Sequence, residues 1–118
     1  RTVDTVIKTG NPMADAILNS KISLANSKDI SVQADAHIPV RLSTSELDLC
    51  CILGNLFDNA IDAVLPLPPD ERIIRIYMDM KGSQLYISFT NFTAQKKRKK
   101  ERFVFLPAAH SSLRRRLQ

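Results

Sequence analysis

The sequence contains little glycine and has no long apolar run. Its only glycines are Gly10, Gly54 and Gly82, so it has no glycine-rich loop of the kind whose backbone amides cradle a phosphate. A membrane-spanning helix needs at least about 18 consecutive apolar residues, and no such run occurs. The first residues also lack the basic-then-apolar order of a signal peptide. We therefore expect a soluble fragment.

Cysteine is also scarce, and the two cysteines are the neighbours Cys50 and Cys51. An ordinary disulfide between adjacent residues is strained, and the pair has none of the spacings of a metal site. Free cysteine commonly behaves as a small hydrophobic residue. We expect two buried thiols in a reducing cytosol.

The charge of the chain is unevenly distributed along its length. Its 118 residues are 44% apolar and 25% charged, which is the size and composition of one small domain. Residues 1–95 include 8 basic and 11 acidic residues, a net charge of −3, whereas residues 96–118 include 9 basic and 1 acidic residue, a net charge of +8. We therefore divide the chain into a core, residues 1–95, and a basic tail, residues 96–118.

A first helix is predicted to start at Asn11 and Pro12. Asparagine can accept hydrogen bonds from the free amides of a first turn, and proline suits the first helical position because no amide donor is needed there. The apolar spacing continues to about Ser27, so the helix should cover residues 12–27. Its buried face should contain Met13, Ala14, Ile17, Leu18, Leu24 and Ala25.

A strand and a longer helix should follow. Residues 30–36 alternate apolar and polar side chains, which is typical of a half-buried strand. Ser43 and Glu46 have the spacing of a capping box, which predicts that a helix begins at this point. The helix should extend to about Val64, because prolines from position 66 onwards prevent it from continuing.

The remaining patterns predict a hairpin and a layered fold. Residues 74–80 and 85–89 alternate around a Lys81-Gly82-Ser83 turn, which indicates a β-hairpin with one apolar face. Residues 103–106 could form a short edge strand inside the basic tail. The simplest architecture is α+β, a two-layer α/β sandwich with the helices on one face of a mostly antiparallel sheet.

The second helix separates an apolar face from a polar stripe. The apolar face contains Leu49, Leu53, Leu56, Phe57, Ala60 and Val64, and the polar stripe contains Asp48, Asn55, Asp58, Asn59 and Asp62. Most polar stripes are solvated surfaces, but asparagine is a poor helix former and adds no charge, so two asparagines one turn apart favour a binding role. An amide oxygen suits Mg²⁺ that takes its other ligands from water and phosphate.

Two segments of the chain resemble a known superfamily. Residues 49–63, LCCILGNLFDNAIDA, closely resemble the N box of the GHKL superfamily of gyrase, heat-shock chaperone, histidine kinase and mismatch-repair ATPases. The form NLFDNAIDA within it looks most like the peptide-sensing, quorum-type sensor histidine kinases. Residues 11–19, NPMADAILN, are similar to the first helix of that same group. Together with the hairpin, the resemblance covers about residues 9–91.

The resemblance implies a Bergerat fold that binds ATP as a substrate with Mg²⁺. Asn59 would coordinate the metal, and Asn55 stands where hydrolysing members carry a glutamate that activates water. Because an amide cannot act as a general base, this favours phosphoryl transfer to a protein histidine over ATP hydrolysis. Asp58 and Asp62 would flank the site, with a purely structural role for Asp58 as the alternative. Asn91 would accept the adenine amine, unless it is a plain turn residue.

The chain departs from the family pattern after the hairpin. Family members continue with an ATP lid and a His-Gly-x-Gly-Leu segment, whereas the nearest segment here is His110-Ser111-Ser112-Leu113, without either glycine. We therefore expect ATP binding to be weak or absent. We also consider the hypothesis that the sequence from about Glu101 onward comes from a disrupted reading frame.

The resemblance also implies partners outside this sequence. These are upstream dimerisation helices that carry the phosphoacceptor histidine, and a response regulator that receives the phosphoryl group. The domain would be cytoplasmic, in a parent protein anchored to the membrane by N-terminal segments. Two alternatives remain: a non-catalytic remnant of the fold that acts as an interaction module, and a nucleic-acid binder that uses the basic tail. The second is disfavoured because no aromatic residues interleave with the Lys/Arg run.

Overall fold

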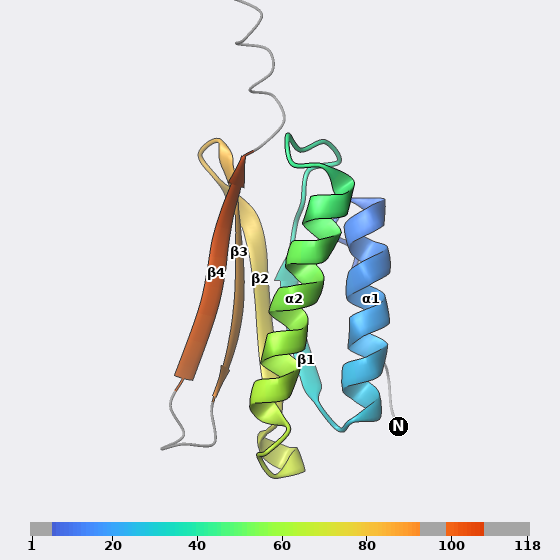
Figure 1. Ribbon diagram of the computed structural model, residues 1–118, viewed down its shortest axis with the longest axis vertical. Helices are drawn as coiled ribbons and strands as arrows, with labels where there is room; N and C mark the ends of the chain where they lie inside the picture. The colour runs from blue at the N-terminus through green and yellow to red at the C-terminus, as the bar shows by residue number, and fades with distance from the viewer. Residues whose placement is uncertain (1–5, 93–98, 108–118) are drawn as a thin grey trace, which may run out of the picture.

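Two helices lie side by side against one face of a four-stranded sheet (Figure 1). The computed structural model describes residues 6–92 and 99–107. The elements follow in the order α1 (Pro12–Ser27), β1 (Ser31–Ala36), α2 (Glu46–Val64), the 3₁₀ helix η1 (Pro69–Glu71), β2 (Ile73–Lys81), β3 (Gln84–Phe92) and β4 (Lys99–Pro107). The α+β sandwich predicted from the sequence is therefore confirmed. No helix within the described ranges has the length and apolar character needed to cross a membrane.

Helix α1 has the predicted ends, and its buried face keeps Ala14, Leu18 and Ala25 of the predicted set but not Met13 or Leu24. The side chain of Asn11 accepts a hydrogen bond from the Ala14 amide at 3.1 Å, and Pro12 occupies the first position. Met13 and Leu24, which were expected to be buried, are 40% and 41% exposed. The buried residues are Ala14, Leu18, Ile22 and Ala25. This stripe follows steps of four, four and three residues, and it is the one that faces α2 and the sheet.

The N-cap of helix α2 lies two residues after the predicted capping serine. Ser45, not Ser43, is the N-cap, and its hydroxyl accepts a hydrogen bond from the Asp48 amide at 3.1 Å. The capping-box prediction was therefore wrong in its register. Upstream, the Asn11 side-chain amide donates to the carbonyls of Pro39 and Val40 at 3.0 and 3.3 Å. These hydrogen bonds hold residues 39 and 40 at the start of α1, and α2 begins after this connection. The helix ends at Val64 as predicted.

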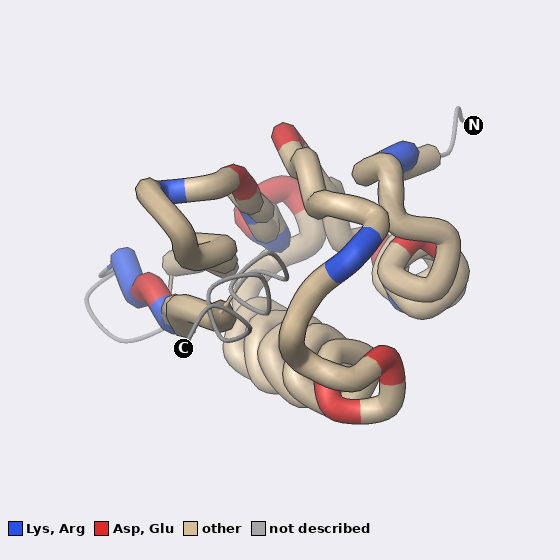
Figure 2. The backbone as a smooth tube through the Cα atoms, turned by 90° about the horizontal axis from the view of Figure 1, so that it is seen from above, with Lys and Arg blue, Asp and Glu red and all other residues tan. Residues whose placement is uncertain are grey.

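The sheet has the order β1-β2-β3-β4 and is mixed. Strand β1 runs parallel to β2, while the β2–β3 and β3–β4 pairs are antiparallel. The β2–β3 hairpin turns at Gly82, whose φ of 64° is disfavoured for residues with a Cβ atom. The charged start of β4 lies on the opposite side of the molecule from α1 (Figure 2).

Strand β4 is longer than the four-residue strand expected within the basic tail. It pairs with β3 over its whole length, from Phe92 opposite Lys99 to Gln84 opposite Pro107. The open edge of the nine-residue strand β3 provides backbone partners along the full segment, including its charged start. The sheet therefore continues past residue 95, where charge alone had placed a boundary. Residues 96–98 and 108–118 of the basic tail, including His110, lie outside the described residues.

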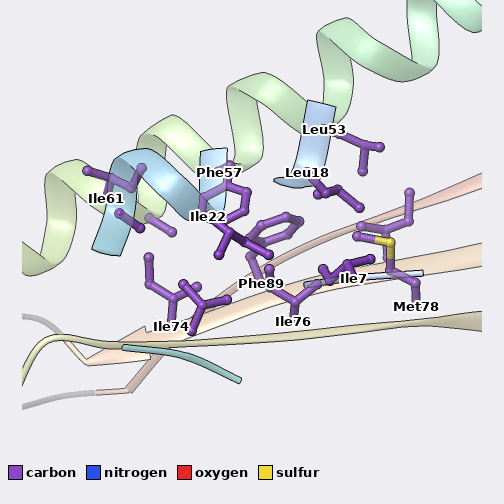
Figure 3. Close-up of a cluster of buried hydrophobic side chains, with 14 of the residues drawn as sticks. Ile7, Leu18, Ile22, Leu53, Phe57, Ile61, Ile74, Ile76, Met78 and Phe89 are labelled. Carbon is purple, nitrogen blue, oxygen red and sulfur yellow. The ribbon is translucent and has the colours of Figure 1, made fainter. Parts of the chain in front are cut away.

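The hydrophobic core fills the space between the helices and the sheet (Figure 3). Phe57 of α2 and Phe89 of β3 are fully buried, and their rings meet edge to face with centroids 5.3 Å apart. This contact fixes the height of α2 relative to β3. The cysteines are outside this core: Cys50 is half-buried and Cys51 is exposed. The expectation of two buried thiols was therefore wrong: Cys51 lies on the outward side of α2, and Cys50, near the start of the helix, is only partly covered.

Arg72 holds the connection after α2 in place. Its guanidinium donates to the carbonyls of Leu67 at 2.9 Å, Lys28 at 2.9 Å and Leu65 at 3.1 Å. Two of these carbonyls lie just beyond the last turn of α2, and the third follows α1. One side chain thus satisfies carbonyls at the ends of both helices.

Candidate functional site

The polar stripe of α2 has two flanks, and α1 covers one of them. Lys21 of α1 lies close to Gly54 and forms an ion pair with Asp58, with Nζ 2.6 Å from Oδ1. The Lys21 side chain is 22% exposed and that of Asp58 is 50% exposed. Asp58 therefore points along the α1 side of the helix and joins the two helices. This geometry favours the structural role that the sequence left open for this residue.

Asn55, Asn59 and Asp62 lie on the outward face of α2. All three are exposed, and none of their side chains bonds to another residue in the described part of the chain. At about 100° per residue, Asn59 lies on the opposite flank of the helix from Asp58. Asn55 and Asn59, the asparagine pair, therefore offer free amide groups. Asn59 is turned towards the side where the sheet continues to β3 and β4.

Asn91 is a strand residue, and the alternative of a plain turn residue is wrong. It lies near the end of β3, opposite Ile74 on β2 and Lys100 on β4. Its side chain is on the helix-facing side of the sheet, together with Ile87 and Phe89, and the residue is 2% exposed. The amide nitrogen donates to the Phe92 carbonyl at 3.1 Å, but Oδ1 is buried and has no partner among residues 6–92 and 99–107.

An unpaired buried oxygen is costly for a fold to maintain. Leaving an acceptor unsatisfied typically costs about 1–3 kcal/mol, and unpaired groups at buried positions often mark functional sites. The Asn91 oxygen could accept a hydrogen bond from a ligand with an exocyclic amine, such as adenine. The residues present therefore fit the nucleotide that the sequence resemblance implied.

The relative heights of these groups follow from the Phe57–Phe89 contact. Helix α2 and strand β3 run in the same direction (Figure 1). Asn91 is two residues after Phe89, which is about 7 Å along the strand. It therefore lies level with the helix residues that are about one turn after Phe57. Asn91 thus lies further along this direction than Asn55 and Asn59.

The hollows formed by the described residues do not bring the predicted site residues together. A hollow of about 380 Å³ lies at the start of α2, lined by Asn11, residues 40–46 and Leu49, and it contains none of the five predicted site residues. Asn91 borders a smaller one of about 120 Å³ with Phe92 and Lys99. The hollows formed by the described residues therefore do not join Asn59 to Asn91.

The sequence analysis missed two basic residues next to this site. Lys100 and Arg102 were counted only as part of the basic tail, but β4 places both on the helix-facing side of the sheet, opposite Asn91 and Phe89. The period-two order of residues 100, 102, 104 and 106, which ends in Val104 and Leu106, was the signal that could have identified them.

Comparison with protein families agrees with this geometry. The family model described as the GHKL domain matches residues 45–112 of the chain. The match starts at the N-cap of α2 and includes β2, β3 and β4, so it covers more than half of the sequence. A search of curated proteins gave no match.

Proposed function

Because this chain belongs to the GHKL family, whose domains bind ATP, we propose that it is the catalytic domain of a two-component sensor histidine kinase of the quorum-sensing, peptide-sensing type. The reaction is the transfer of the γ-phosphoryl group of ATP to a histidine outside this sequence. A response regulator is the next acceptor. The upstream helices of a membrane-anchored parent protein supply the histidine and the dimer contacts, and this domain is on the cytoplasmic side.

The observation that best supports nucleotide binding is the unpaired Asn91 oxygen. It is buried, it accepts no hydrogen bond, and it lies on the same side of the sheet as α2. In this proposal it accepts the adenine amine. The free amide of Asn59 supplies one ligand to Mg²⁺, which takes its remaining ligands from phosphate and water. Asp62 acts through a bound water, while Asp58 keeps its ion pair with Lys21.

The choice of kinase over ATPase depends on Asn55. Its exposed amide has no proton-accepting group that could activate water at neutral pH. With water poorly activated, the γ-phosphoryl group remains available for a histidine that is brought to it. The absence of glycine from the His110-Ser111-Ser112-Leu113 segment weakens the hold on the phosphates. We therefore expect impaired nucleotide binding by this chain and no self-phosphorylation.

Titration calorimetry with a non-hydrolysable ATP analogue and Mg²⁺ tests the binding step. We expect dissociation constants in the micromolar range or weaker for the wild-type chain and loss of the heat signal in Asn59→Ala. Cys51→Ala is the matched control because Cys51 is also exposed on α2, and it should bind like the wild type. Absence of binding by the wild-type chain, or equal binding by Asn59→Ala, would contradict the proposal.

The kinase assignment needs a separate measurement. Phosphate release from ATP should be no faster for the wild-type chain than for Asn59→Ala, whereas Asn55→Glu should raise it, by up to about 100-fold if the new carboxylate acts as a general base. Wild-type hydrolysis as fast as that of Asn55→Glu would instead indicate an ATPase.

A second candidate is an interaction module that keeps the fold without the chemistry. It is favoured by exposed aromatic residues on the sheet face that the helices leave uncovered: Phe103 and Phe105 are 56% and 45% exposed. Their rings lie 5.9 and 5.0 Å from that of Tyr86. A wild-type chain that binds no nucleotide but is well folded would support this candidate.

A further inference from the structure

Two buried side-chain atoms in the described part of the chain have no hydrogen-bond partner, and they lie on neighbouring strands. One is Oδ1 of Asn91 on β3, and the other is Nε of Arg102 on β4. The first can only accept a hydrogen bond and the second can only donate one. They do not satisfy each other. A ligand with a donor at one end and an acceptor at the other would satisfy both.

The strand register places both side chains on the same face of the sheet. Arg102 is directly opposite Phe89, and Asn91 is directly opposite Lys100. Residues opposite each other in an antiparallel pair share a face, so Arg102 emerges on the helix-facing side with Phe89. Asn91 and Arg102 are diagonal neighbours there, with a typical separation of about 7–8 Å between such positions.

The height of Arg102 matches that of the asparagine pair on α2. Phe89 contacts Phe57 at a centroid distance of 5.3 Å, and Arg102 stands beside Phe89. Phe57 is midway between Asn55 and Asn59 in the helix, about 3 Å along the axis from each. Arg102 therefore lies at the level of the two free amides, while Asn91 lies about one helical turn further along.

The flank of α2 next to Arg102 is the one that α1 does not cover. Helix α1 is on the far side of α2, and neither described helix lies over β4 (Figure 1). The charged start of β4 is on this same side of the molecule (Figure 2). Arg102 is half-buried as a residue and its Nε is buried, so part of the residue remains accessible to a ligand on this uncovered side.

We propose that Arg102 binds the phosphate chain of a nucleoside di- or triphosphate whose base is read by Asn91. This inference rests on the proposed function and adds a residue to its site. The guanidinium provides a positive charge and forked donors for phosphate oxygens, at the height where Asn59 presents its amide to Mg²⁺. It thus supplies phosphate contacts in a chain that has no glycine-rich loop for them.

The test compares ATP, ADP and adenosine as ligands of the complete chain by titration calorimetry. Arg102→Ala should weaken ATP and ADP binding by about 10- to 100-fold, the range of a charge-assisted hydrogen bond, and should leave adenosine binding unchanged. Arg102→Lys should recover part of the loss because it restores the charge without the fork. Asn91→Ala should weaken all three ligands.

Lys81→Ala is the matched control. Lys81 has the same charge and is exposed at the end of β2, where its ammonium lies over the rings of Tyr77 and Tyr86. It should leave the affinities for all three ligands unchanged. The salt dependence of ATP binding should become shallower in Arg102→Ala and stay the same in Lys81→Ala. If Arg102→Ala does not fold, as judged by circular dichroism, Arg102→Gln tests the same loss of charge.

The outcomes separate this inference from the function on which it rests. Wild-type binding that depends on Asn91 and Asn59 but is equal in Arg102→Ala overturns the role of Arg102 and leaves the nucleotide site standing. Equal losses in Arg102→Ala and Lys81→Ala would also overturn it, since any basic residue of the domain would then suffice. A wild-type chain that binds neither ATP nor adenosine overturns the proposed function together with this inference.

Discussion

Lys21 and Asp58 join the two helices of this domain through an ion pair of 2.6 Å between Nζ and Oδ1. The pair crosses from α1 to the flank of α2 that lies away from β4. Asp58 therefore has a structural contact, whereas the side chains of Asn55, Asn59 and Asp62 are exposed and bond to no other residue in the described part of the chain.

Asp58→Asn should affect stability slightly and nucleotide binding not at all. Because the Asp58 side chain is 50% exposed, solvent screens the pair and the loss in unfolding free energy should stay below about 1 kcal/mol. Urea unfolding measures this loss, and Lys21→Gln should give a similar value. A tenfold weaker affinity for the ATP analogue in Asp58→Asn would place this residue in the site after all.

Asn91→Leu should separate stability from function. The change removes the unpaired buried oxygen and fills the position with an apolar side chain next to Ile74, so we expect the unfolding free energy to stay equal or rise by about 1 kcal/mol. Adenosine binding should be abolished. Denaturant unfolding and calorimetry on the same sample measure both effects. A large loss of stability would show that the Asn91 side chain is needed for folding, not for a ligand.

Arg72→Ala should destabilise the domain more than the same change at an exposed arginine. It removes hydrogen bonds to three carbonyls near the helix ends, and we expect a loss of about 2 kcal/mol in unfolding free energy. Arg75→Ala is the control because Arg75 is exposed on β2 and its side chain bonds to the Gln33 side chain at 3.1 Å. Similar thermal midpoints for the two variants would contradict the role given to Arg72.

Glu101 should make stability fall at acidic pH. Hydrogen bonds from the hydroxyls of Ser88 at 2.6 Å and Tyr86 at 2.8 Å lower the pKa of its carboxyl from the usual 4.5, with Ser88 as the main cause. The unfolded chain then binds the proton more tightly than the folded chain. The contribution of Glu101 to the unfolding free energy is therefore complete above pH 4.5, and it is lost as the pH falls through the lower pKa of the folded state.

Urea midpoints measured between pH 3 and 7 test this contribution of Glu101. Below about pH 4.5, the urea midpoint should fall less steeply with decreasing pH in Glu101→Gln than in the wild-type chain. The effect should be small because Glu101 is exposed. An unchanged slope in Glu101→Gln would assign the acid sensitivity to other carboxyls.

Local signals in the sequence determined the elements and the family of this protein. Asn11 and Pro12 start α1 at the predicted residue, and α2 ends at Val64 just before the prolines. These features depend on caps and ring geometry within a few residues, which a single sequence displays directly. The N-box letters of residues 49–63 indicated the GHKL family, to which the family match assigns the chain.

Tertiary contacts decided the features that give the candidate site its shape. They selected Ile22 instead of Met13 for the buried face of α1, extended β4 along the open edge of β3, and turned Asn91 into the interior with an unpaired oxygen. They also assigned Asp58 to Lys21 and placed Arg102 on the helix-facing side of the sheet, opposite Phe89. Periodicity defines which residues share a face, but only packing between distant segments determines what that face meets.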